Sequence, residues 1–119
     1  MSCLFNSLSY YTPNTNHQTL RNTIIDYIAS NPEFEIGTAE YAIYHDSGKS
    51  LAEYVNYMRN SSSWGGAIEI MAYAKVFKTN VIVRVINTGM KIEFVGDLTT
   101  KECIKLRWTG NHYEPDLNS

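Results

Sequence analysis

Two reactive side chains stand near opposite ends of the chain. Cys3 lies near the N-terminus, whereas His112 lies near the C-terminus with a carboxylate, Glu114, two positions further on. A thiol becomes an effective nucleophile when its pKa is lowered or a base takes its proton, and an imidazole is the usual base in cysteine hydrolases. Because a fold can bring distant residues together, their separation along the chain is no obstacle. The pairing therefore indicates a thiol nucleophile served by an imidazole.

The length and composition fit a single domain spanning residues 1–119. Hydrophobic residues make up 44% of the chain and charged residues 18%, as in compact globular proteins. A domain of this size buries about two thirds of the surface that its unfolded chain exposes, so Cys3 and Cys103 are not needed as a disulfide. No apolar run is long enough to span a membrane, and no signal region is evident. We expect a soluble cytoplasmic protein, where a reducing environment suits a reactive thiol.

The charge pattern argues against nucleic acid as a partner. The net charge is −2, and the ten basic residues are scattered along the chain rather than clustered to neutralise phosphates. His45 and Asp46, even taken with His17 or Cys103, lack the ligand spacing of a zinc site. We therefore expect no metal, no cofactor, no nucleic-acid partner and no membrane partner.

The spacing of apolar residues predicts two helices in the first part of the chain. A short helix opens at the cysteine and covers residues 3–10. An amphipathic helix follows over residues 16–31, with Thr15 or Asn16 as its cap. Residues 32–49 show no clear period, and we expect them to form a surface loop that contains a short element.

Two further helix starts carry specific signals. Ser50 and Glu53 have the spacing of a capping box, in which each side chain accepts a hydrogen bond from the other residue's backbone N–H. The sequence Trp64-Gly65-Gly66 introduces another helix. Its expected inward positions are Ala67, Ile70, Met71, Ala74 and Phe77.

The last third of the chain predicts strands. Residues 81–86 are almost wholly apolar and β-branched, as expected of a central strand covered on both faces. Residues 90–94 and 104–108 alternate apolar with charged side chains, which indicates half-buried strands. The chain then leaves the sheet at residues 109–111 and presents His112. The expected fold class is α+β, with helices packed on a small, mainly antiparallel sheet. In the strand over residues 90–94, we expect the apolar residues Met90, Ile92 and Phe94 to face inward.

Three segments resemble motifs of the ovarian-tumour (OTU) family of cysteine proteases, most of whose characterised members are deubiquitinases. Residues 2–8, Ser-Cys-Leu-Phe-Asn-Ser-Leu, are similar to the nucleophile segment of that family. Residues 64–72, Trp-Gly-Gly-Ala-Ile-Glu-Ile-Met-Ala, are similar to its tryptophan-glycine-glycine helix start, and residues 111–114, Asn-His-Tyr-Glu, to its histidine motif. Their order and the intervening strand also match. The resemblance covers almost the whole chain and implies an OTU-like, papain-type cysteine protease fold.

The same resemblance implies roles for individual residues. Cys3 is the nucleophile and His112 the general base, while Glu114 stands where many members carry Asp or Asn to orient the imidazole. Asp116 is an alternative orienting group. In the resembled family the tryptophan-glycine-glycine region borders the channel for a glycine-rich tail, although it also fits a simple hydrophobic anchor before a helix. The implied substrate-binding residues are Trp64, Gly65, Gly66, Asn111 and Tyr113.

The implied reaction is hydrolysis of an isopeptide or peptide bond at the C-terminus of ubiquitin or a ubiquitin-like modifier. A helix start at Cys3 favours thiolate over thiol, and His112 can accept a proton and later deliver it to the leaving amine. Backbone amides near Cys3 would hold the oxyanion. The compactness of the chain favours a minimal viral or microbial protein that acts in the host cytoplasm.

The residues before the cysteine leave two other interpretations open. Family members usually carry Asp-Gly-X there, whereas this chain has Met1 and Ser2. Because that turn helps to shape the oxyanion site, the chain could instead be a catalytically impaired OTU-like domain that binds ubiquitin or another protein. A third interpretation is an unrelated α+β domain, in which Cys3 and His112 would lie far apart.

Overall fold

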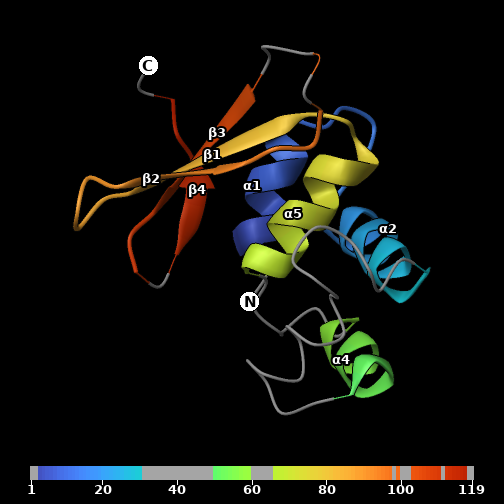
Figure 1. Ribbon diagram of the computed structural model, residues 1–119. Helices are drawn as coiled ribbons and strands as arrows, with labels where there is room; N and C mark the ends of the chain where they lie inside the picture. The colour runs from blue at the N-terminus through green and yellow to red at the C-terminus, as the bar shows by residue number, and fades with distance from the viewer. Residues whose placement is uncertain are drawn as a thin grey trace.

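A computed structural model of the chain shows helices gathered beside a small twisted sheet (Figure 1). It describes residues 3–30, 50–59, 66–97, 99, 103–110 and 112–117. The predicted α+β class is confirmed. In chain order the elements are α1 (Cys3–Tyr10), α2 (His17–Ser30), α4 (Leu51–Met58), α5 (Ala67–Val76), β1 (Asn80–Val85), β2 (Lys91–Phe94), β3 (Cys103–Trp108) and β4 (Tyr113–Pro115).

The predicted helix signals have local physical causes in the structure. Of the two proposed caps of α2, Asn16 is the one that acts, because its side-chain oxygen accepts a hydrogen bond from the Thr19 N–H at 2.9 Å. The capping box of α4 is present, with the Glu53 N–H donating to Ser50 Oγ at 3.3 Å and the Ser50 N–H donating to Glu53 Oε1 at 3.2 Å. The surface loop predicted over residues 32–49 lies outside the described residues.

Helix α5 begins after Gly66 and is buried over most of its length. The Gly66 N–H donates to Glu69 Oε1 at 2.7 Å, so the carboxylate satisfies an N–H group that the helix start leaves unpaired. Ile70, Met71 and Ala74 face the core as predicted. Phe77 does not, since it is 38% exposed and lies just beyond the last turn, where the helical periodicity no longer holds.

The sheet has the strand order β2-β1-β3-β4. β1 lies inside it as predicted, antiparallel to β2 and parallel to β3, and β4 pairs antiparallel with β3. The sheet is thus mainly antiparallel with a parallel central pairing. β4 corrects the expectation that the chain leaves the sheet after residue 108. Its Pro115 suits an edge strand, because proline has no N–H to donate to a further neighbour.

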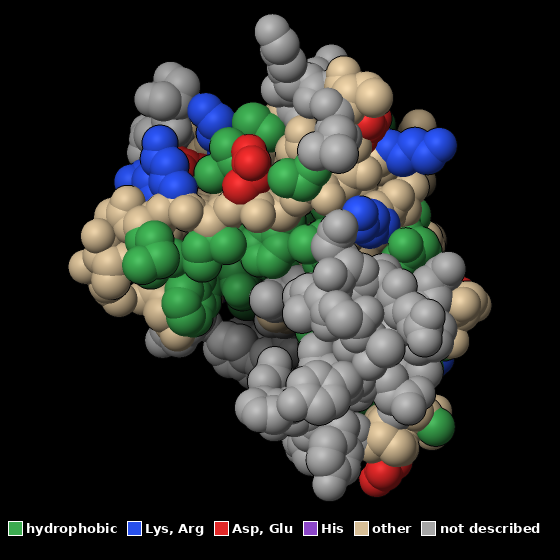
Figure 2. Space-filling view, in the orientation of Figure 1, with side chains coloured by type: hydrophobic (Ala, Val, Ile, Leu, Met, Phe, Trp, Pro, Cys, Tyr) green, Lys and Arg blue, Asp and Glu red, His purple; other side chains and the backbone are tan. Residues whose placement is uncertain are grey.

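The far end of the sheet extends beyond the helices (Figure 1). Val81, Val83 and Leu106 lie on the covered part and are buried. Met90 and Ile92, predicted to face inward, are 58% and 42% exposed, because the hairpin that carries them extends past the helical layer. Figure 2 shows hydrophobic side chains along this end of the molecule.

Helix α1 connects the helices to the sheet. It packs against β4 and α2, and its Leu4, Phe5 and Leu8 side chains are fully buried. Just after the helix, the Tyr11 hydroxyl donates a hydrogen bond to the Lys105 carbonyl of β3 at 2.7 Å. Among the helices of the described residues, none is both long enough and apolar enough to cross a membrane.

A buried charged group joins the helices to one another. The Arg21 guanidinium of α2 is fully buried, lies 4.3 Å from the centroid of the Phe5 ring and donates to the Met58 carbonyl at 2.8 Å. Glu69 of α5 is buried as well and accepts a hydrogen bond from the Tyr54 hydroxyl of α4. Burial lowers the pKa of Arg21 and raises the pKa of Glu69, and each charge opposes the shift of the other.

We predict that Arg21→Met lowers the free energy of unfolding by about 3–5 kcal/mol, because it leaves the buried Glu69 without its cation. Arg59→Met is the matched control, since Arg59 forms an exposed ion pair with Asp26 at 2.7 Å, and it is expected to change stability by at most about 1 kcal/mol. Urea denaturation followed by circular dichroism measures both changes. Equal losses in the two variants would contradict the importance of the buried charge.

Candidate active site

Cys3 is the first residue of α1, as the sequence predicts. It is half-buried, and neither it nor Cys103 forms a disulfide. The buried side chains of Leu4 and Phe5 fix the start of the helix against the core. The unpaired backbone N–H groups and the positive end of the helix dipole lie at this end of α1. The predicted nucleophile therefore stands at a helix start, half-buried and without a disulfide partner.

His112 directly precedes β4, and Glu114 is the middle residue of that strand. The turn between β3 and β4 is closed by the Thr109 N–H, which donates to the His112 carbonyl at 3.0 Å, and Gly110 takes a φ of +108° that other residues rarely adopt. His112 Nε2 lies 3.8 Å from Glu114 Oε2, and both side chains are partly exposed. This distance is too long for a direct hydrogen bond but close enough for an electrostatic contact. Glu114 is thus the carboxylate beside the imidazole.

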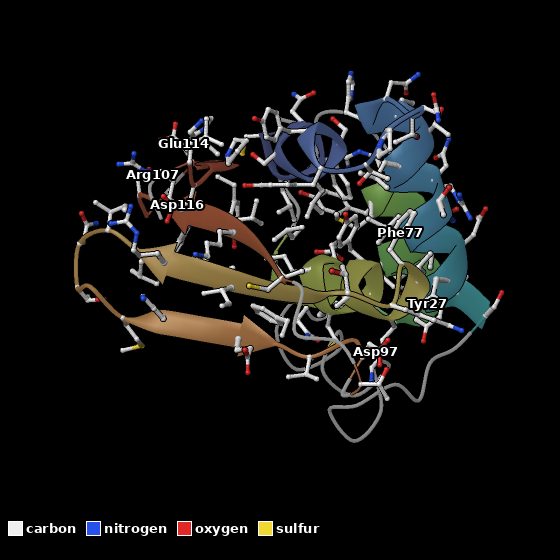
Figure 3. The ribbon with its side chains drawn as sticks, turned by 90° about the horizontal axis from the view of Figure 1, so that it is seen from above. Tyr27, Phe77, Asp97, Arg107, Glu114 and Asp116 are labelled. Atoms are coloured by element: carbon white, nitrogen blue, oxygen red, sulfur yellow. The ribbon has the colours of Figure 1, made fainter. Side chains whose placement is uncertain are left out.

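Asp116, the alternative orienting group, is engaged elsewhere. Its two carboxylate oxygens accept hydrogen bonds from Arg84 of β1 at 2.8 and 3.0 Å, and its backbone N–H donates to the Lys105 carbonyl. Its side chain is almost fully buried. Figure 3 shows Asp116, Glu114 and Arg107 together at one end of the sheet, on adjacent strands. Of the two carboxylates that the sequence offers, Glu114 is the one that lies beside the imidazole, and its orienting role stays a prediction.

Tyr113 connects the two halves of the site. It lies on β4 between His112 and Glu114, and its ring stacks on Trp108 with 6.0 Å between the ring centroids. Burial raises the pKa of the Tyr113 phenol, and the negative charges of Glu69 and of an ionised Cys3 raise it further. The phenol therefore lies within electrostatic range of both residues. Together with the packing of α1 on β4, this brings the thiol end of the chain to the strand that follows His112.

The structure describes only part of the predicted substrate-binding set. Gly66 is the N-cap of α5 and is half-buried, and Tyr113 is placed as above. Trp64, Gly65 and Asn111 lie outside the described residues, so a role in the channel remains a prediction. Within the described part of the chain, no three His, Cys, Asp or Glu side chains group closely enough to hold a metal ion.

Two charged residues near the site were not singled out from the sequence. Glu69 follows Gly66 by three positions, which is the spacing at which a glutamate can reach back to a helix start, so the sequence did contain a signal for it. Arg107 lies on β3, and its Nε is 3.0 Å from Glu114 Oε1. That contact depends on the register between two strands, one of which was not predicted, and so it carried no sequence signal.

The sequence model of the OTU family, described as OTU-like cysteine protease, matches residues 2–115. The chain belongs to the OTU family. Ubiquitin thioesterase OTU1 of Dictyostelium discoideum is 30% identical over 116 residues, covering 95% of this chain and 34% of the relative. The protein of the same name in Gallus gallus is 30% identical over 120 residues, covering 96% and 37%. The chain thus spans little more than a third of the length of these relatives.

Solved structures show the same fold. An OTU domain in complex with ubiquitin superposes with a TM-score of 0.78 at 23% identity, covering 96% of this chain and 62% of that chain. The Hazara virus OTU bound to ubiquitin gives a TM-score of 0.74 at 20% identity, covering 96% and 73%. The OTU-like fold expected from the sequence is confirmed, which excludes the interpretation as an unrelated α+β domain.

We predict that Glu114→Gln slows the alkylation of Cys3 by iodoacetamide about tenfold at neutral pH. The substitution removes the negative charge that would orient the His112 imidazole and stabilise its protonated form. The reaction is followed by mass spectrometry in a Cys103→Ser background, so that Cys3 is the one thiol that can be alkylated. Asp116→Asn is the control. It is expected to lower the urea midpoint through the weakened Arg84 contact while leaving the alkylation rate within about twofold. A larger rate effect in Asp116→Asn than in Glu114→Gln would reverse the assignment.

Proposed function

We propose that this OTU-family chain is a thiol-dependent deubiquitinase, which hydrolyses isopeptide or peptide bonds at the C-terminus of ubiquitin or a ubiquitin-like modifier. The observation that carries the proposal is the arrangement of the three predicted catalytic residues. Cys3 opens a helix that packs on β4, and β4 begins directly after His112 and carries Glu114. Relatives named as ubiquitin thioesterases and OTU structures bound to ubiquitin support this substrate class.

The proposed mechanism begins with the transfer of the thiol proton from Cys3 to His112. In this proposal the proton goes to the imidazole nitrogen that does not face Glu114. The thiolate attacks the carbonyl carbon of the terminal residue of the modifier, and the resulting oxyanion is held by backbone N–H groups near the start of α1. The imidazolium then protonates the leaving amine as the carbon–nitrogen bond breaks, which leaves a thioester on Cys3.

The second half of the cycle releases the modifier. His112, now neutral, takes a proton from water as its oxygen attacks the thioester carbonyl. The carbon–sulfur bond breaks, the imidazolium returns its proton to the Cys3 thiolate, and the modifier leaves as a carboxylic acid that ionises in water. In both halves Glu114 stabilises the charged imidazolium, as a carboxylate does in other nucleophile–imidazole pairs.

The substrate site in this proposal lies around the predicted channel. Gly66 offers a helix start without a side chain, and Tyr113 directly follows His112 and lies within electrostatic range of Cys3. Trp64, Gly65 and Asn111 complete the set as sequence predictions. Action in the cytoplasm and a viral or microbial origin are also proposed from the sequence alone.

We predict that the protein forms a covalent adduct with one member of a panel of ubiquitin-family probes that carry C-terminal electrophiles. Mass spectrometry should show the adduct in the unaltered protein and in Cys103→Ala, but not in Cys3→Ala. His112→Ala should slow adduct formation by about a hundredfold or more, because the thiol loses its base.

The same panel separates catalysis from binding alone. A folded protein that binds ubiquitin reversibly in a pull-down but forms no adduct with any probe would refute the hydrolase and favour the impaired binding domain. Folding is checked on the same samples by circular dichroism.

A further inference from the structure

The carboxylate of Glu114 lies between two cationic or titratable groups. One oxygen, Oε2, faces His112 Nε2 at 3.8 Å, and the other, Oε1, lies 3.0 Å from the Nε of Arg107. Arg107 and Glu114 are directly opposite each other in the β3–β4 ladder. Residues in this relation have neighbouring side chains on the same face of a sheet, so the ion pair follows from the register itself.

An unanchored glutamate would hold an imidazole poorly. Its side chain has three rotatable bonds, and that of Glu114 is partly exposed, so a free carboxylate would spend much of its time away from His112. The 3.0 Å approach of Oε1 to the Arg107 Nε is an ion pair, in which the N–H is not aligned as a hydrogen bond. The attraction holds one carboxylate oxygen near the guanidinium and so restricts where the other oxygen can lie.

We propose that Arg107 is a positioning residue, which holds Glu114 so that its second oxygen stays beside His112. The charged groups around this contact come from three strands. They are Glu114 of β4, Arg107 of β3 and Arg84 of β1, together with Asp116, which directly follows β4 and binds Arg84.

Arg84 serves as the matched control for Arg107. It lies beside Arg107 on the neighbouring strand, where the two residues are partners in the β1–β3 register. Its guanidinium is bound to Asp116, at 2.8 and 3.0 Å, rather than to Glu114. Removing Arg84 therefore changes the charge of the same face without releasing Glu114.

Positioning and simple charge screening give opposite results in a double-mutant cycle. In the unaltered protein, Glu114→Gln should displace the NMR signals of the His112 ring, because the carboxylate beside the imidazole loses its charge. If Arg107 holds the carboxylate in place, the effect of Glu114→Gln should shrink or vanish in an Arg107→Gln background, because the carboxylate has already moved away. If Arg107 only screens the charge, the effect should grow.

Two further steps complete this experiment: the Arg84→Gln control and the assignment of the NMR signals to His112. In an Arg84→Gln background, Glu114→Gln should keep its full effect on the ring NMR signals of His112. The chain has three histidines, and the His112 signals are those that His112→Ala removes. The proposal is overturned if the effect of Glu114→Gln is unchanged or larger in Arg107→Gln, or if Arg84→Gln reduces it equally. Arg107→Lys, which keeps a cation at the position, provides a second folded background in which the coupling should be retained in part.

The consequence for turnover rests on the proposed function and is measured separately. Arg107→Gln should lower kcat on a ubiquitin substrate about as much as Glu114→Gln does, with KM unchanged and no further loss in the double variant. The NMR arm needs no substrate. Coupling without activity would therefore uphold the positioning role while refuting the hydrolase, and activity without coupling would do the reverse.

Discussion

A buried guanidinium is the constraint on which the helical half of this protein depends. Arg21 has lost its contact with water, so its charge must be met from within the fold. The guanidinium packs on the Phe5 ring and donates a hydrogen bond to the Met58 carbonyl, and the Glu69 carboxylate attracts it electrostatically. These three groups come from three different helices. Each helix must therefore keep its place for the charge to remain satisfied. Removing one partner from such a pair is far more destabilising than never burying it.

This arrangement also determines where Cys3, the predicted nucleophile, lies. Phe5 follows Cys3 by two positions, and the guanidinium packs on its ring, so the start of α1 is fixed by the same group that fixes α5. Glu69 meanwhile binds the N–H of Gly66 at the start of α5. The two helix starts to which the family motifs belong are thus held by one buried network. The His112 side of the site is held differently, by strand pairing and by charged pairs on a sheet face.

Local sequence signals predicted the helices well because their causes are local. Asn16, Ser50 and Glu53 act within a few residues of themselves, and the resemblance to a family supplied Cys3 and His112. The parallel pairing of β1 with β3 could not be predicted in the same way, because it depends on a crossover of the chain. β4 is only three residues long and includes a proline, which leaves no alternation to detect.

The remaining errors concern the limits of the core. Met90 and Ile92 alternate correctly with charged residues, but the helices do not reach far enough to cover them. Periodicity identifies which face a side chain is on and not what lies above it. Arg21, in turn, looks like an ordinary polar position of an amphipathic helix, and only the surrounding helices make it a core residue.

The packing of α1 on β4 has a consequence for how the protein is made. A ribosome synthesises α1 first among the described elements and β4 last, so the apolar side chains of the helix emerge long before the strand that covers one side of them. A contact between segments so distant in sequence forms slowly, because the intervening chain must be ordered first. During translation Cys3 is therefore present well before His112. In the nascent chain, α1 can meet its partner strand only when synthesis has passed β4.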